Sequence, residues 1–246
     1  MGGKLKGLYL EDLTWPEAET AFREYTVAVL PVGARTKEHG FHLPLKNDFV
    51  IAEYLARRVT ESCRVITLPT VPYGYYPAFV EYPGSVNLPK KLFRDTICEI
   101  CRSIAAHGLK RIYVLNTGIS TNTPLKLARR KLLVEGIAFE YTDLHQTLTQ
   151  LKSTLLTQQA GTHADELETS MMLYIAPEIV KLAKAKKDVH PNKGPGGLTR
   201  NPSATTGVYS PTGAWGDPTL ATRKKGEIYI EALVKELIAA VERMQV

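Results

Sequence analysis

The chain has 246 residues, of which 44% are hydrophobic, and a formal net charge of +6 at pH 7. These values fit an ordinary soluble protein, and no apolar run approaches the roughly 20 residues of a membrane span. The basic N-terminus has no apolar core behind it and is not expected to be a signal peptide. The scattered basic residues lack aromatic interleaving or a binding motif, which argues against a nucleic-acid partner.

Three cysteines, Cys63, Cys98 and Cys101, are too few for a disulfide framework. Cys98 and Cys101 have the spacing of a redox or zinc pair, but they lie in a helical pattern and no second pair accompanies them. We expect buried free thiols, and therefore a reducing, cytoplasmic setting.

Short apolar segments alternate with helix-length segments along the chain. In chain order, the pattern predicts a strand at residues 28–32, a helix at 49–59, a strand at 64–68, a helix at 90–107, a strand at 111–115, a helix at 124–134, a strand at 137–141, and helices at 164–176 and 218–244. This alternation predicts an α/β fold with a mostly parallel central sheet flanked by helices. Ligands of such sheets bind beyond the carboxyl ends of the strands, where loops 33–47 and 116–123 lie.

Two other segments have a distinctive composition. Residues 192–217 are dense in Gly, Pro, Ser and Thr, and are too long for an idle connection, so we expect a lid or a subunit-contact loop. Residues 73–82 contain four tyrosines and a phenylalanine, a composition that suits a pocket lining or, slightly better, an oligomer interface.

The loop after the first predicted strand carries the densest group of reactive side chains. It contains Lys37, Glu38, His39 and His42 and leads to Asp48. Histidine and carboxylate groups on a loop beyond a strand are the usual components of a metal or acid–base site. The alternative is a polar loop whose histidines only cap or hydrogen-bond their neighbours.

Several motifs, in order, resemble the creatininase (creatinine amidohydrolase) family. They are LPVG at 30–33, HGFHLP at 39–44 with Asp48, YPGSV at 82–86, the segment 116–124, THADELETS at 162–170 and GDPTLAT at 216–222. The resemblance covers nearly the whole chain. It implies a single creatininase-like domain over residues 1–246, built as a three-layer sandwich, and a homo-oligomer, with a hexamer favoured.

Members of the family resemble binuclear metal hydrolases that act on cyclic amides or formamides. By this resemblance, His39 and Asp48 stand at ligand positions, and Glu166 stands at a late glutamate ligand, with Glu168 as the competing choice. The implied cofactor is one divalent transition metal (Zn, Mn or Fe) held by His39, Asp48 and Glu166 with water.

Two of the family's ligands are missing from this chain. Lys37 occupies the place of a glutamate ligand, and residues 116–122 contain no histidine where the family has one. The Lys37 ammonium, placed beside Asp48, would fill the volume and partly replace the charge of a lost ion. Alternatively, a one-residue bulge swings Glu38 into the glutamate position and turns Lys37 outward. In a third arrangement no metal binds, and His39, Asp48 and His163 form a hydrogen-bonded cluster.

The remaining roles follow from residue chemistry and the same resemblance. His163 is placed to protonate the leaving nitrogen of an opened amide, or else it only marks a helix start. Lys37 or Ser120 is expected to hold a developing oxyanion. Three residues are expected to contact the substrate: Glu38, His42 and Trp215. His42 is also expected to orient His39 or a carboxylate, and Trp215 is expected to close over the site.

These observations indicate a metal-dependent hydrolase of a C–N bond in a small-molecule amide. The substrate is expected to differ from creatinine, because the ligand set departs from the family. The alternative is a non-catalytic small-molecule-binding or assembly protein that keeps the fold.

Overall fold

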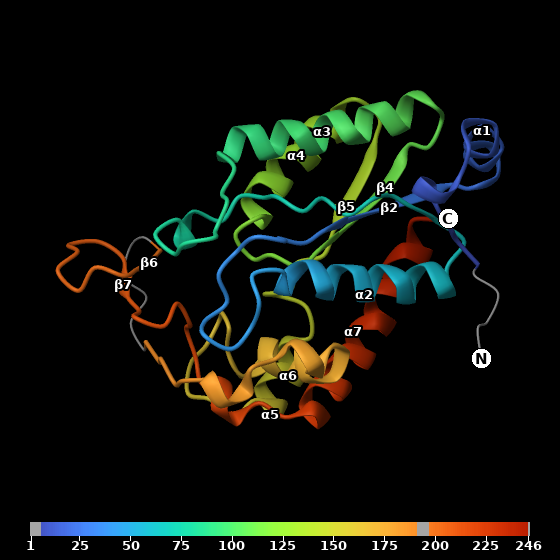
Figure 1. Cartoon of the computed structure of the whole chain (residues 1–246). Coiled ribbons are helices and arrows are strands. Elements are labelled where there is room, and N and C mark those ends of the chain that lie inside the picture. Colours follow the sequence, from blue (N-terminus) through green and yellow to red (C-terminus); the bar gives the residue numbers. More distant parts are fainter. Residues whose placement is uncertain (1–5, 191–196, 246) are drawn as a thin grey trace.

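The central element of the molecule is a five-stranded parallel sheet (Figure 1). The computed structural model describes residues 6–190 and 197–245. In spatial order the strands are β1 (Leu8–Tyr9), β3 (Ile66–Thr67), β2 (Val27–Val32), β4 (Arg111–Asn116) and β5 (Ala138–Tyr141). The predicted α/β fold is confirmed, and the four predicted strands are present. The two-residue strand β1 was not predicted.

The helices, in chain order, are α1 (Trp15–Glu24), α2 (Asn47–Ser62), α3 (Lys90–Ala106), α4 (Asn122–Val134), α5 (Thr149–Leu155), α6 (Glu166–Ile175) and α7 (Arg223–Arg243). Five of them match predicted helices. The additional helix α1 begins with a capping box, in which the Glu17 carboxylate accepts from the backbone N–H of Thr14 at 2.7 Å. The additional helix α5 is a short segment that follows Leu148, whose φ of 54° is left-handed.

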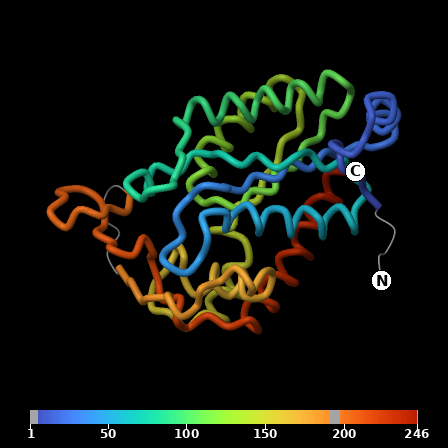
Figure 2. Tube along the Cα trace, in the orientation of Figure 1, coloured from blue at the N-terminus to red at the C-terminus, as the bar shows by residue number. Residues whose placement is uncertain are grey.

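The helices form a layer on each face of the sheet (Figures 1 and 2). The side chains of β2 alternate between two hydrophobic clusters, as the period of a strand requires. Val27 and Val29 belong to the cluster with α2, α6 and α7, whereas Ala28 and Leu30 belong to the cluster with α3 and α4. Because both faces are covered, β2 is buried along its whole length.

The chain order creates a crevice at the carboxyl ends of β2 and β4. From β2 the chain passes through α2 to β3 on one side, and then through α3 to β4 on the other side of β2. Such a switch point is where open α/β sheets bind ligands. Gly33 lets α2 begin close to the end of β2, because a Cβ there would lie 2.5 Å from the backbone oxygen of Asp48. The Thr117 hydroxyl, beyond β4, donates to the same oxygen at 3.0 Å.

The two loop segments singled out in the sequence lie next to each other. Tyr76, Phe79 and Tyr82 are buried in a small cluster with Leu198, so much of the aromatic loop packs inside this chain. Leu198 lies in β6 (Leu198–Thr199), which pairs in parallel with β7 (Val208–Tyr209). The first part of the expected lid or contact loop, residues 192–196, lies outside the described residues. Within residues 6–190 and 197–245, no helix has the length and apolar character needed to cross a bilayer.

The three cysteine thiols are buried and unpaired, and we expect them to be inert in the native protein. Burial raises the pKa of Cys63 to about 11 and that of Cys101 to about 12, and it also raises the pKa of Cys98. Since the thiolate is the reactive form, Ellman's reagent should label no thiol until the chain is unfolded, when three should react. An exposed thiol introduced by Lys91→Cys should react at once, and rapid labelling without it would contradict the expected burial.

Candidate metal centre

Lys37 and Asp48 form a buried ion pair at the start of α2. The Lys37 Nζ lies 2.6 Å from Asp48 Oδ2, and the two side chains are 7% and 2% exposed. Burial would lower the pKa of Lys37, but the negative charges of Asp48, Glu168 and Glu38 outweigh it, so the pKa lies above its usual range. The ammonium is therefore charged and directed inward. The arrangement in which Lys37 turns outward is not the one that the structure has.

His39 is held by two contacts that define how its nitrogens are used. Its Nδ1 lies 2.8 Å from the backbone oxygen of Lys37, and its Nε2 lies 2.8 Å from Asp48 Oδ1. A carbonyl oxygen only accepts, so Nδ1 donates to it, and in the neutral ring Nε2 keeps a lone pair. This second nitrogen is directed toward the Asp48 carboxylate.

Glu38 contacts His163 rather than the Lys37–Asp48 pair. His163 Nε2 donates to Glu38 Oε1 at 2.7 Å and lies 3.0 Å from the Glu38 backbone oxygen. Gly213 makes room for this contact, because a Cβ there would lie 2.1 Å from Glu38 Oε2. Burial opposes both charges, but the contact prevails: the pKa of His163 lies above its usual value and the pKa of Glu38 lies below it. The other nitrogen of His163, Nδ1, lies 3.7 Å from Glu168 Oε2.

The two glutamates of α6 point to different surroundings. Glu168 Oε2 accepts from the backbone N–H of Ala164 at 2.6 Å, and Ala164 has a left-handed φ of 46° that bends the chain next to His163. Glu166 is fully buried and accepts from the backbone N–H groups of Thr157 and Gln158 and from Lys225. The ligand set expected from the family resemblance places Glu166 with His39 and Asp48. In the structure its carboxylate contacts Lys225 and backbone N–H groups instead.

A metal ion fits a different set from the one expected. Ligand atoms of His39, His163 and Glu168 all lie within 4.8 Å of one another. Two histidines and one glutamate are a known donor set of catalytic zinc sites. Each histidine is also oriented through its second nitrogen, His39 by a backbone carbonyl and His163 by the Glu38 carboxylate, as metal-bound histidines usually are. The donor chemistry therefore fits a single divalent metal, with Asp48 beside it.

The other expected site residues surround this set at different distances. His42 Nε2 lies 2.7 Å from the Thr169 hydroxyl, and burial lowers the pKa of His42 to about 4, so it is neutral and packs behind α6. Trp215 pairs with His163 through backbone hydrogen bonds in both directions, at 3.3 and 2.8 Å, and its indole lines the adjoining cavity. Ser120 lines the same cavity. Phe79, from the aromatic segment expected to line a pocket or an interface, lines this cavity, and its ring centroid lies 4.2 Å from that of His163.

The segment that lacks the family's histidine is occupied by a hydrogen-bond network. The Asn116 amide donates to the backbone oxygen of Gly118 and to Asn122, and its oxygen accepts from the Thr121 hydroxyl at 2.6 Å. Asn122 in turn donates to Asp143 at 2.7 Å. Hydrogen bonds within the segment and to Asp143 thus fix its conformation, and it offers no histidine to a metal.

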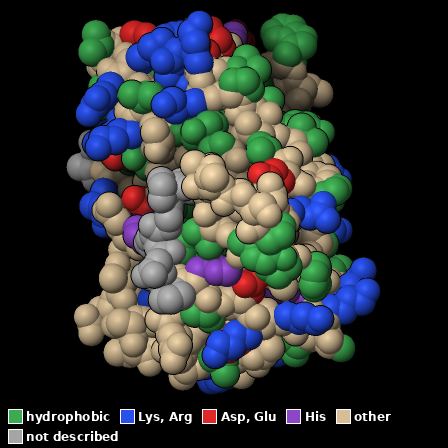
Figure 3. Space-filling model, turned by 90° about the vertical axis from the view of Figure 1, so that its left-hand side faces the viewer, with side chains coloured by type: hydrophobic (Ala, Val, Ile, Leu, Met, Phe, Trp, Pro, Cys, Tyr) green, Lys and Arg blue, Asp and Glu red, His purple; other side chains and the backbone are tan. Residues whose placement is uncertain are grey.

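A cavity of about 380 Å³ opens over the candidate metal set. Its lining includes Lys37, His163 and Glu168, with Phe79 and Trp215 as aromatic walls. Figure 3 shows the face toward which loop 33–46 extends, where histidine and acidic side chains reach the surface between hydrophobic ones.

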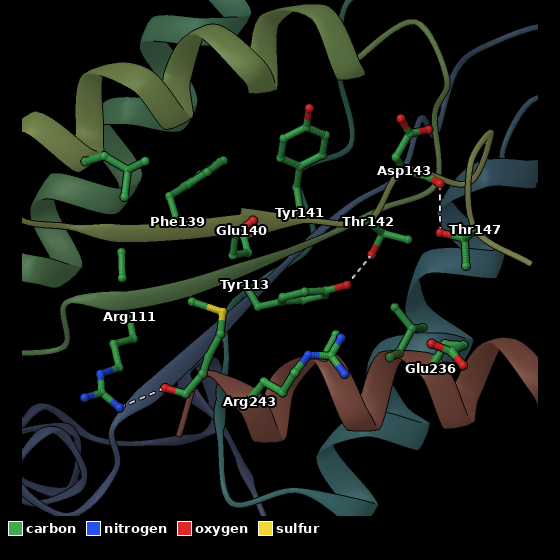
Figure 4. A pocket seen from close by; sticks show the side chains of 15 residues that line it. Arg111, Tyr113, Phe139, Glu140, Tyr141, Thr142, Asp143, Thr147, Glu236 and Arg243 are labelled. Atoms are coloured by element: carbon green, nitrogen blue, oxygen red, sulfur yellow. Dashed lines mark hydrogen bonds between the residues drawn. The ribbon is translucent and has the colours of Figure 1, made fainter. Parts of the chain in front are cut away.

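A larger cavity, about 650 Å³, lies far from this set, between β5 and the end of α7 (Figure 4). Its lining includes Arg111, Glu236 and Arg243 but no histidine or cysteine among the described residues.

Comparisons with known proteins give a consistent result over the whole chain. The family model described as Creatininase: Creatinine amidohydrolase matches residues 11–241. Creatinine amidohydrolase of Pseudomonas putida is 25% identical over an alignment 265 positions long, gaps included, which covers 96% of each protein. The mycofactocin precursor peptide peptidase of Mycobacterium ulcerans is 25% identical over an alignment 246 positions long, which covers 94% of this chain and 86% of the peptidase. A solved structure described as creatininase Mn has a TM-score of 0.80 at 24% identity, with 97% of this chain and 99% of that chain covered, and thus shares the fold.

Proposed function

Since the chain belongs to the creatininase family, we propose that it is a metal-dependent hydrolase that cleaves a C–N bond of an amide. The observation that carries this proposal is the cluster of His39, His163 and Glu168, of which His163 and Glu168 line a cavity of small-molecule size and His39 is buried next to them. The names of its relatives, a creatinine amidohydrolase and a peptide peptidase, support hydrolysis and suggest amides of different sizes as substrates. No observation favours the non-catalytic alternative.

The side chains around the cluster have separable tasks. A divalent metal, when bound, would polarise the carbonyl oxygen and lower the pKa of a water. Lys37 lines the cavity, and since Asp48 engages only part of its ammonium, the remaining N–H groups can donate to an oxygen that gains negative charge. Glu38 fixes the ring of His163 so that Nδ1 faces Glu168. The sequence predicts that His163 protonates the leaving nitrogen of the amide. If Nδ1 of His163 holds the metal, it cannot also carry out this protonation.

We propose that the Lys37 ammonium replaces a second cation, so that the protein binds one ion per chain. Elemental analysis of protein loaded with Zn²⁺ or Mn²⁺ should give one equivalent. Lys37→Glu should not raise this value to two, because the segment 116–122 still lacks a histidine. Lys46→Glu makes the same charge change at an exposed position of the same loop and serves as the control. Two tightly bound ions in the unmodified protein would contradict the replacement.

The hydrolase proposal itself is tested with a panel of amides. Metal-loaded protein should hydrolyse at least one member of a panel of cyclic amides, formamides, N-acyl amides and short peptides, with creatinine included for comparison. Removal of the ion with a chelator should abolish the activity, and returning the ion should restore it. A metal-loaded protein that hydrolyses none of these compounds would favour the non-catalytic alternative.

We also propose that the chain forms one domain and acts as a homo-oligomer in a reducing, cytoplasmic compartment. The three buried free cysteines support the reducing compartment. A sheet buried between two helix layers supports the single domain. Homo-oligomerisation is carried over from the family resemblance.

A further inference from the structure

A second cavity of about 410 Å³ adjoins the cavity over the candidate metal set. The two cavities share five lining residues: Thr117, Ile119, His145, Thr162 and Glu168. Glu168 therefore lies where they meet, with one cavity on each side of it. We call the cavity that contains His163 the metal lobe and the other one the side lobe, since they are two parts of one cleft.

The side lobe differs from the metal lobe in its chemistry. Its apolar lining comes mainly from helices α6 and α7 and from the segments that flank α5, and includes Leu144, Leu156, Leu167, Met171 and Tyr229. Met171 and Tyr229 are buried beneath it, whereas the three leucines are only half-buried and present apolar surface to the open space. Polar and charged residues also line it, and besides the shared ones these are Thr149, Lys152, Ser153, Gln158 and Asp165. Neither His39 nor His163 lines the side lobe.

The half-buried leucines need an apolar occupant to be withdrawn from water. Apolar surface contributes to binding in proportion to the area that a ligand covers. A compact polar cyclic amide bound in the metal lobe would leave this surface exposed. A substrate with an apolar arm on the reacting amide would reach past Glu168 and cover it.

We propose that the side lobe binds an aliphatic or aromatic arm of the substrate, whose reacting amide lies beside Glu168. This inference rests on the proposed amide hydrolysis, and it narrows the substrate class to amides with a large apolar group, such as N-acyl amides or peptides with an apolar residue at the cleaved bond. It places compact polar amides among the poor substrates. The arm is recognised by volume and apolar contact, so that lengthening it strengthens binding until the lobe is filled.

Two series of probes test the side lobe in the metal-loaded protein. Straight-chain alkyl hydroxamates from two to eight carbons chelate a metal through two oxygens and extend an arm, and the primary amides of the same chain lengths lack the chelating group. Calorimetry should show tighter binding with each added methylene, by up to roughly fourfold, in both series. The chain-length dependence reports the side lobe, and the advantage of each hydroxamate over its amide reports the metal.

Matched substitutions in α5 and at the residue that follows it locate the effect. Ser153 lines the side lobe, and its neighbour Thr154 is exposed and does not, although both hydroxyls donate to the backbone oxygen of Gln150. Ser153→Trp and Leu156→Trp should flatten the chain-length dependence and leave the two-carbon hydroxamate unaffected, whereas Thr154→Trp should change neither. Leu156→Ala should instead extend the rise to longer chains.

The outcomes separate this inference from the proposed function. Affinity that does not change with chain length in either series overturns the side lobe as a binding site. The same holds if the rise survives both Ser153→Trp and Leu156→Trp. A rise in the amide series without any hydroxamate advantage would leave the side lobe supported and would count against the metal centre.

Discussion

Glu168→Gln is expected to remove the bound metal and, with it, amide hydrolysis. The amide of glutamine is neutral and is a weaker donor than a carboxylate, and the remaining set would hold only His39 and His163 as close partners. Since changes around a ligand already cost 10–100-fold in metal affinity, loss of the ligand itself should cost more than about 100-fold. Metal titration by calorimetry or a chromophoric chelator measures this loss directly.

Glu166→Gln is the matched control, two residues earlier on the same helix. Its carboxylate is engaged by Lys225 and by backbone N–H groups rather than by the histidines. We expect this variant to keep its metal and to lose about 2 kcal/mol of stability, because hydrogen bonds to a charged group are weakened. The reverse result, metal lost with Glu166→Gln and kept with Glu168→Gln, would mean that α6 presents its other face to the centre.

Gly226→Ala is expected to be strongly destabilising. Gly226 lies in α7 against α6, and a Cβ there would lie 1.8 Å from the backbone oxygen of Ser170. The helices would have to separate, and overpacking of this kind costs about 3 kcal/mol or more. For a chain of this size the midpoint of thermal unfolding should fall by roughly 6–12 °C.

Lys235→Ala provides the comparison, since Lys235 is exposed on the same helix. Its unfolding midpoint should stay close to that of the unmodified protein, because exposed positions without special contacts change stability by about 0.5 kcal/mol or less. An unchanged midpoint in Gly226→Ala would show that α6 and α7 can move apart at little cost. In that case the contact would not fix the position of α6.

Much of the fold could be predicted because its buried elements carry their own periodicity. β2 and β4 are continuous apolar runs, and α2 and α3 repeat buried residues at helical spacing. The helix α1 escaped prediction because it buries only Ala21 and lies at the surface, so its apolar pattern is weak. The segment of α5 is too short for a helical period to stand out.

The candidate site could be predicted only where sequence neighbours remain spatial neighbours. Loop 33–47 leads directly into α2, so Lys37, His39 and Asp48 come together as anticipated. The choice between Glu166 and Glu168 is different, because residues two apart on a helix differ by about 200° in direction. Which of them faces the histidines depends on how α6 is rotated, and contacts with Lys225 and Gly226 of α7, some 60 positions away in the chain, hold that rotation.

The backbone pairing of His163 with Trp215 has a mechanical consequence. Two hydrogen bonds join the residues, and Gly216 is joined in the same way to Asp188. The part of the cleft wall that contains Trp215 is thereby hydrogen-bonded to the extended segment that carries His163, a candidate metal ligand. The wall around Trp215 therefore cannot swing away as an independent flap without displacing the imidazole of His163. Opening the wall on that side to admit a bulky substrate would therefore also displace a candidate ligand, whereas entry past α5 leaves the pairing of His163 with Trp215 undisturbed.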